Sequence, residues 1–265
     1  MQPAIKMALR TARQNSDFLK DQFARLDPVN QKADSLLKTL NAIDDTIFER
    51  SVEQLKRAYP DHFMAPAGNV DADDAERSWH VFPLMGRQNF SRGLPEFVTG
   101  LLQKRNNRAE NLVLSNPMTG EEYAFSRGYG AVLNSRRIRV RNANHLDQTL
   151  LCCNLANQAR EGEDGELRLD MAGALMRSGA SLRYSGCPAL DMARVAAGNL
   201  DAAVLAPLEP EEQVMGTLIS QESGALSGDA RGNPLTSNSR ELIIANSPIF
   251  REILKALKPF HARLG

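Results

Sequence analysis

Apolar residues recur at every third or fourth position along the first 60 residues, which is the spacing of one face of an α-helix. Ile5 and Leu9 begin such a face in the first segment, which Asp27-Pro28 ends. The same spacing returns over residues 36–55 and stops at Tyr59-Pro60. The sequence therefore predicts two amphipathic helices at the start of the chain.

Short runs of apolar, β-prone residues separated by turn residues follow these helices. Residues 65–76 are rich in small and acidic side chains and are expected to form an exposed loop. Strands are expected at residues 79–84, 97–102, 111–114 and 123–126. Their spacing predicts an antiparallel meander.

The second half of the chain alternates between the two periodicities. After a polar link at residues 139–147, strand-like residues 150–154 lead into predicted helices at 171–178, 189–197 and 211–222. A final strand at 242–245 precedes a helix at 248–257. We therefore predict an N-terminal part of helices and antiparallel sheet at residues 1–141 and an alternating α/β part at 142–265, packed together as one compact unit.

Composition changes this picture little, because 42 % hydrophobic and 24 % charged residues are usual for a globular protein. Lys plus Arg and Asp plus Glu both number 32, so the net charge gives no general attraction to nucleic acid or acidic lipid. No direct contact with nucleic acid is expected. One basic cluster, Arg136, Arg137, Arg139 and Arg141, is interpreted as a solvated strand or loop, with contact to RNA or an acidic protein as the alternative.

No run of 18 apolar residues and no hydrophobic signal core occur, so we expect neither membrane insertion nor secretion. The three cysteines, Cys152, Cys153 and Cys187, lack C-x-x-C spacing and suit a reducing compartment. A cytoplasmic protein is therefore expected, with Cys152 and Cys153 buried in a strand.

Two segments carry a resemblance to a known family. Residues 79–90 read W-H-V-F-P-L-M-G-R-Q-N-F and resemble W-x-x-D-P-(hydrophobic)-D-G-T-x-N-F, a signature of the inositol monophosphatase family. Residues 183–201 resemble its second signature, R-x-x-G-(S/C)-A-A-L-D-x-A-x-V-A-A-G-x-x-D. Smaller matches keep the order found in bacterial SuhB-type members. The resemblance implies a mixed α/β (α+β) fold, the family's layered αβαβα sandwich, and a homodimer.

The chain departs from the family where magnesium is bound. Phe82 and Met85 stand in place of the two aspartates of the first signature, and Ala67 stands in place of a glutamate of the G-E-E-S turn. Magnesium takes oxygen ligands in near-octahedral geometry, which these three side chains do not offer. The resemblance therefore implies a lost magnesium site, and no cofactor is expected.

Other family positions near the reaction have also changed. Arg87 replaces the threonine that helps to activate the attacking water, and Leu205 replaces a carboxylate that contacts the substrate. Glu211-Glu212 stands in place of a W-D pair, so that only Glu212 could still coordinate a metal. Asp44 matches an acidic residue near the nucleophilic water, with a solvated helix aspartate as the other interpretation.

These departures favour a pseudoenzyme that acts as a binding or regulatory module, with a protein partner of the transcription antitermination type by analogy with SuhB-type members. One alternative is a magnesium-dependent phosphatase of inositol or sugar phosphate monoesters, rebuilt on Asp44, Glu212, Glu211 and Asp191. Another is a metal-free phosphate or anion site on Arg87. No catalytic or metal-binding residue is assigned. The expected vestigial pocket consists of Asp44, Ala67, Phe82, Leu84, Met85, Gly86, Arg87, Gln88 and Glu212.

Overall fold

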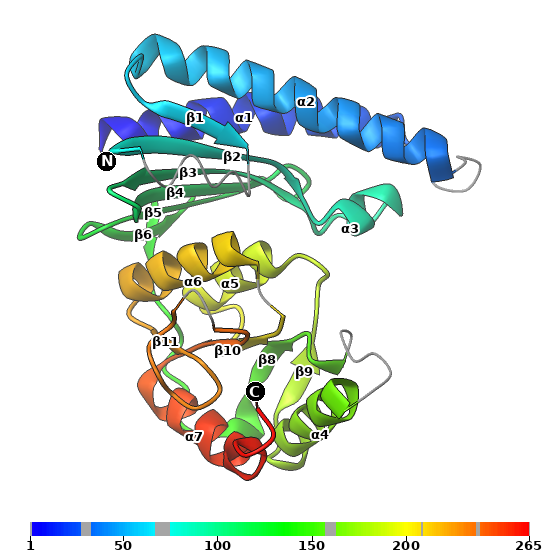
Figure 1. Cartoon of the computed structure of the whole chain (residues 1–265), viewed down its shortest axis with the longest axis vertical. Helices are drawn as coiled ribbons and strands as arrows, with labels where there is room; N and C mark the ends of the chain where they lie inside the picture. The colour runs from blue at the N-terminus through cyan, green and yellow to red at the C-terminus, as the bar shows by residue number, and fades with distance from the viewer. Residues whose placement is uncertain are drawn as a thin grey trace. The chain divides into compact units, whose positions relative to one another are not determined.

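The structure is a computed structural model that describes residues 2–27, 33–66, 75–156, 163–207, 209–236 and 239–264. The chain divides into two compact units, residues 1–136 and residues 137–265. Each unit has a sheet and helices of its own (Figure 1). The association of both halves in one compact unit stays a prediction.

Two long helices form one layer of the first unit. They are α1 (Pro3–Ala24) and α2 (Ala33–Ala58), and both lie against the same face of the first sheet (Figure 1). The predicted helices are confirmed, although α2 is longer at both ends than its apolar pattern indicated. Asn15 and Ser51 join the two helices through a buried hydrogen bond of 3.0 Å.

The first sheet has seven strands in chain order. β1 is parallel to β2, and the successive pairs from β2 to β6 are antiparallel, so the predicted meander is confirmed. The expected loop at residues 65–76 is wrong at its start, because Ala65 is buried in β1 and pairs with His80. The strands are β1 (Phe63–Pro66), β2 (Arg77–Met85), β3 (Val98–Arg105), β4 (Arg108–Asn116), β5 (Glu121–Ser126), β6 (Gly130–Leu133) and β7 (Arg136–Ile138).

A hydrophobic core lies between this sheet and the two helices. Trp79, Val81 and Leu84 of β2 belong to it, together with Ile43 and Ile47 of α2. These side chains alternate along β2 until a register shift between Phe82 and Met85 interrupts the pairing with β3. The core therefore fixes one face of β2 through the first half of the signature segment, from Trp79 to Leu84.

The second unit contains a five-stranded sheet in the order β11-β12-β10-β8-β9. β8, β9 and β10 are parallel to one another, whereas β12 is antiparallel to β10 and β11. The predicted burial of Cys152 and Cys153 in a strand is confirmed. The strands are β8 (Leu150–Cys153), β9 (Ser181–Arg183), β10 (Ala202–Leu205), β11 (Leu226–Gly228) and β12 (Leu242–Ala245).

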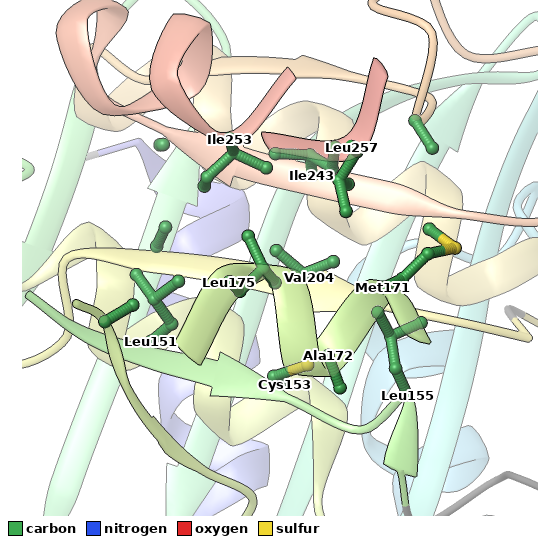
Figure 2. Close-up of a cluster of buried hydrophobic side chains, with 14 of the residues drawn as sticks. Leu151, Cys153, Leu155, Met171, Ala172, Leu175, Val204, Ile243, Ile253 and Leu257 are labelled. Carbon is green, nitrogen blue, oxygen red and sulfur yellow. The ribbon is translucent and has the colours of Figure 1, made fainter. Parts of the chain in front are cut away.

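Helices cover both faces of this sheet. α4 (Glu163–Arg177) and α7 (Ser247–Leu257) enclose a hydrophobic core with β8, β10 and β12, in which Leu151, Met171, Val204, Ile243 and Ile253 meet (Figure 2). α5 (Pro188–Ala196) and α6 (Pro210–Ser223) pack together and contact β10 and β12. The mixed α/β fold with two sheets is therefore confirmed. No helix of the described residues is long and apolar enough to cross a membrane.

Candidate functional site

The signature segment leaves the first sheet at the end of β2. Phe82 pairs with Gly100 of β3 and Met85 pairs with Val98, with the register shift between them. Thr99 Oγ1 donates a 3.2 Å hydrogen bond to the carbonyl oxygen of Phe82. The backbone is therefore held to β3 at the position where the family places its first aspartate.

Apolar packing fills the space around the two replaced aspartates. Phe82 is 5 % exposed and Met85 is half-buried. A Cβ atom at Gly100 would lie 2.9 Å from Met85 Cε and 2.9 Å from Leu114 Cδ2, so these side chains close over the glycine. Met85 is flexible enough to occupy such an irregular space. At residues 82 and 85 the signature segment therefore has packed apolar side chains in place of carboxylates.

Gly86 turns the chain from β2 into the short helix α3 (Arg87–Ser91). Its φ of 86° lies in the left-handed region, which glycine adopts without strain. Leu84 before it is buried in the core, and Gln88 after it is exposed. Arg87 is therefore placed at the first position of α3.

Arg87 binds two residues of α2. Its Nη1 forms an ion pair with Asp44 Oδ2, and its Nη2 donates a 2.8 Å hydrogen bond to Asn41 Oδ1. Asn41 and Asp44 are three residues apart and lie on the same helix face. The interpretation of Asp44 as a solvated helix aspartate is wrong, because its side chain is 24 % exposed and ion-paired. The sequence offered one clue, an arginine in place of the family's threonine.

Burial raises the pKa of Asp44, and the neighbouring Arg87 opposes this rise. Within the described part of the chain, Asp44 Oδ1 is buried without a hydrogen-bond partner. The guanidinium thus supplies a positive charge that favours the ionised form of this carboxylate against the effect of burial. We call Arg87, Asp44 and Asn41 the arginine clamp.

Glu212 lies in the second unit and stabilises the start of α6. The backbone N–H of Glu209 donates a 3.2 Å hydrogen bond to Glu212 Oε2, while the Glu209 side chain accepts from the N–H of Glu212. This reciprocal arrangement is a capping box, which satisfies two helix N–H groups. One carboxylate oxygen of Glu212 is therefore already used by the backbone.

Burial also raises the pKa of Glu212 to about 7, and the charges of Glu209 and Glu211 act in the same direction. The hydrogen bond from the Glu209 backbone opposes the shift. A carboxyl group with this pKa is partly protonated near neutral pH and binds a cation less well than an ordinary carboxylate.

This pKa predicts a measurable pH dependence of stability. Between pH 4.5 and 7 the folded state binds the proton of Glu212 more strongly than the unfolded state, so the free energy of unfolding falls as pH rises. Glu212→Gln keeps a side-chain acceptor for the cap but cannot ionise. We compare the free energy of unfolding of the variant with that of the wild type. This difference should be more favourable to the variant at pH 8 than at pH 5, by up to roughly 2 kcal/mol. Urea unfolding of both proteins at both pH values measures this change. The same difference in stability at pH 5 and pH 8 would contradict the raised pKa of Glu212.

The other carboxylate considered for a rebuilt site, Asp191, is engaged within the second unit. It is fully buried, and its Oδ2 accepts hydrogen bonds from Ser185 N (3.1 Å) and Ser185 Oγ (2.7 Å). These bonds hold the loop before α5. Leu205 is fully buried at the end of β10. Both side chains therefore serve the packing of their own unit.

The candidate ligands, Asp44 and Glu212, do not form a site that fits a magnesium ion. Across the described residues, no group of three or more His, Cys, Asp or Glu side chains could hold a metal. Asp44 is bound by Arg87, and Glu212 caps a helix. Ala67 lies outside the described residues.

Bacterial relatives align with this chain along nearly their whole length. The chain is 30 % identical over 263 residues to "Nus factor SuhB" of Pseudomonas aeruginosa, covering 98 % of this chain and 97 % of that protein. It is 28 % identical over 262 residues to the Escherichia coli K12 protein of the same name, covering 97 % and 95 %.

Solved structures share the fold. An IMPase of Thermotoga maritima matches with a TM-score of 0.82 at 21 % identity, over 100 % of both chains. The suppressor protein SuhB of Bartonella henselae matches with a TM-score of 0.82 at 22 % identity, over 97 % of this chain and 99 % of that one. The model of the inositol monophosphatase family matches residues 1–262. This chain therefore belongs to the inositol monophosphatase family.

Proposed function

We propose that this chain is a family member whose phosphatase activity is absent or strongly impaired and whose fold serves as a binding or regulatory module. The arginine clamp carries the proposal. In the family pattern, the positions of Asp44 and Arg87 belong to an acidic residue and a threonine near the nucleophilic water. Here a guanidinium binds the carboxylate directly.

The clamp and the apolar packing act together. Arg87 is fixed to α2 by two contacts, so its guanidinium group faces Asp44 where the family would place a metal. Phe82 and Met85 replace the oxygen ligands that hold a magnesium ion in front of a phosphate. The same region thus keeps its fold while losing the groups that would orient and activate water.

We also propose a protein partner in the transcription machinery. The support is the name "Nus factor SuhB", which is shared by relatives that align over nearly their whole length. Fold alone does not determine function, so this proposal rests on similarity.

Phosphate release tests the proposed loss of activity. The chain is incubated with magnesium and inositol monophosphate or a panel of sugar phosphates, beside the Thermotoga maritima IMPase as a positive control. We expect release at the level of the protein-free blank. Magnesium-dependent release that is abolished in Glu212→Ala would contradict the proposal and favour a rebuilt metal site. Metal-free phosphate binding that Arg87→Ala removes would favour an anion-binding protein.

The homodimer expected from the family is a further proposal, and an exposed apolar patch supports it. Asn116 Nδ2 donates to the carbonyl oxygen of Pro95, and Asn116 Oδ1 accepts from Met118 N at 2.9 Å. These bonds join the loop of Leu94 to the turn of Met118. Leu94 is 47 % exposed and Met118 is 39 % exposed. A second copy of the chain would remove this Leu94/Met118 patch from water.

We expect the double substitution Leu94→Glu and Met118→Glu to convert a dimer to a monomer. Burying two unpaired charges at an interface costs several kcal/mol, which weakens association by more than about 100-fold. Light scattering after size-exclusion chromatography measures the mass against 29.2 kDa for one chain. Leu37→Glu is the matched control, because Leu37 is a 57 % exposed leucine on α2. A monomeric wild type, or a double variant that stays dimeric, would refute the patch as the interface.

A further inference from the structure

A cavity of roughly 450 Å³ lies in the first unit, between the end of α2 and the start of β2. This volume is within the range of about 300–1,000 Å³ that is usual for small-ligand sites. Arg77 and Met85 are the two ends of β2, so the cavity lies about 25 Å along this strand from Met85 and from α3, which follows it (Figure 1). The cavity is therefore separate from the arginine clamp.

Aromatic rings form part of the cavity wall. The rings of Tyr59 and His62 are stacked with their centroids 4.8 Å apart, and Tyr59 also contacts Trp79 with a centroid distance of 5.7 Å. Trp79 is fully buried, whereas Phe63, which also lines the cavity, is 40 % exposed. Aromatic rings favour offset stacking on one another and on nucleic acid bases. A planar heterocycle in this cavity would therefore find a stacking surface.

Two carboxylates line the same cavity. They belong to Asp61 and Glu76, and both residues are exposed. An ionised carboxylate only accepts hydrogen bonds. Sugar hydroxyls and the amino groups of a base are donors, and an acidic residue commonly binds the hydroxyls of ribose. The cavity thus combines surfaces that suit the base and the sugar of a nucleoside.

Three arginines extend from the edge of the cavity across the first sheet. Arg77 of β2 is directly opposite Arg105 of β3, and Arg105 is directly opposite Arg108 of β4. Side chains at directly opposite positions point to the same face of a sheet, with Cβ atoms about 5 Å apart. We call Arg77, Arg105 and Arg108 the arginine row. Because Arg77 also lines the cavity, the row begins at the edge of the cavity.

The backbone fixes the position of the arginine row. Asn106 and Asn107 connect Arg105 to Arg108, and their φ values of 48° and 56° are those of a two-residue hairpin turn. The N–H of Asn106 donates a 2.8 Å hydrogen bond to the carbonyl oxygen of Glu76, which joins this turn to the start of β2. The three strands therefore hold the row in one register.

The arginine row is costly to the sheet by itself, because like charges at directly opposite positions repel each other. All three arginines are exposed. Arg77 Nε lies 3.7 Å from Glu76 Oε1, but these side chains are 50 % and 70 % exposed, and an ion pair of this kind contributes little. Arg105 and Arg108 form no ion pair with any residue that the structure describes. A phosphate bound across the row would relieve the repulsion.

We propose that the cavity and the arginine row together bind a nucleoside monophosphate. The base lies against Phe63 and His62, and the hydroxyls of the ribose donate to Asp61 or Glu76. The phosphate binds the arginine row, because guanidinium groups match phosphate oxygens bidentately. A sugar phosphate lacks the stacking ring and a nucleoside lacks the anion, so each would use only half of this site.

Isothermal titration calorimetry with AMP, GMP, CMP and UMP tests the site, in buffer that contains EDTA so that no metal contributes. We expect at least one nucleotide to bind about 10-fold or more tightly than both its nucleoside and ribose 5-phosphate. The triple variant Arg77→Gln, Arg105→Gln, Arg108→Gln should bind this nucleotide at least about 10-fold more weakly. Phe63→Ala should weaken binding of the nucleotide but not of ribose 5-phosphate, because it removes a ring that stacks on the base.

The matched control removes the same charge from other exposed positions of the first unit, with Arg10→Gln, Arg25→Gln and Arg92→Gln. It should bind the nucleotide like the wild type. Three results would overturn the proposal: no saturable binding of any nucleotide up to about 5 mM, an equal loss in the control variant, or a loss in Arg87→Ala without a loss in the arginine-row variant. The last result would place the phosphate at the arginine clamp. Circular dichroism of all variants verifies that they are folded.

Discussion

Phe82→Asp is expected to lower the free energy of unfolding by about 3–5 kcal/mol, although it restores the residue of the family signature. Phe82 is 5 % exposed, so the substitution removes a buried ring and places a carboxylate among apolar atoms. Met85 closes the same space over Gly100 and offers the new charge no partner. The loss should be similar with and without about 10 mM magnesium chloride, because the remaining ligands are missing.

Urea unfolding of the wild type and the variant, each with and without magnesium, measures this effect. Phe82→Leu is the matched control, since it keeps an apolar side chain and should cost only about 1 kcal/mol. A Phe82→Asp protein as stable as Phe82→Leu would show that the position is open to water. Recovery of several kcal/mol by magnesium would show that a metal site persists around residue 82.

Breaking the arginine clamp is the second large effect that we expect. Arg87→Ala removes the ion pair with Asp44 and the hydrogen bond to Asn41, leaving a mostly buried carboxylate without its cation. The expected loss of stability is about 1–3 kcal/mol at pH 7. It should be smaller at low pH, because the substitution also raises the pKa of Asp44 and a protonated Asp44 needs no cation.

A double-mutant cycle separates the pair from its surroundings. The free energy of unfolding is measured for Arg87→Ala, Asp44→Ala and the double variant, and a coupling energy of about 1–2 kcal/mol is expected. Gln88→Ala is the control, because Gln88 is the exposed neighbour of Arg87 on α3 and should change stability by less than about 0.5 kcal/mol. Additive effects of Arg87→Ala and Asp44→Ala would mean that the contact contributes nothing.

Most of the fold could be predicted because two kinds of signal agreed. The apolar spacing of α2 and the alternation along β2 reflect a face packed on a core, and the two signature segments fixed the family. The start of α4 was missed because residues 163–166 are polar and include Gly165, a weak helix former. β10 begins with two alanines, which have low strand propensity, and becomes a strand through burial between β8 and β12.

The candidate site could be predicted as a set of positions and less well as a set of contacts. The substitutions at residues 82, 85 and 87 are visible in the signature, but their partners come from distant segments. Arg87 meets Asp44 across 43 positions, and Met85 reaches Gly100 on the neighbouring strand. The capping role of Glu212 was readable from Glu209 before α6 and from Pro210 at the first position of that helix.

We propose that this member of the family has lost its magnesium site. Isothermal titration calorimetry of the wild-type chain with magnesium chloride at pH 8 tests it most directly, because Glu212 is then ionised and the conditions favour a remaining site. We predict heats equal to those of dilution up to about 10 mM magnesium. A saturable site with a dissociation constant below about 1 mM, lost in Glu212→Gln, would contradict the claim.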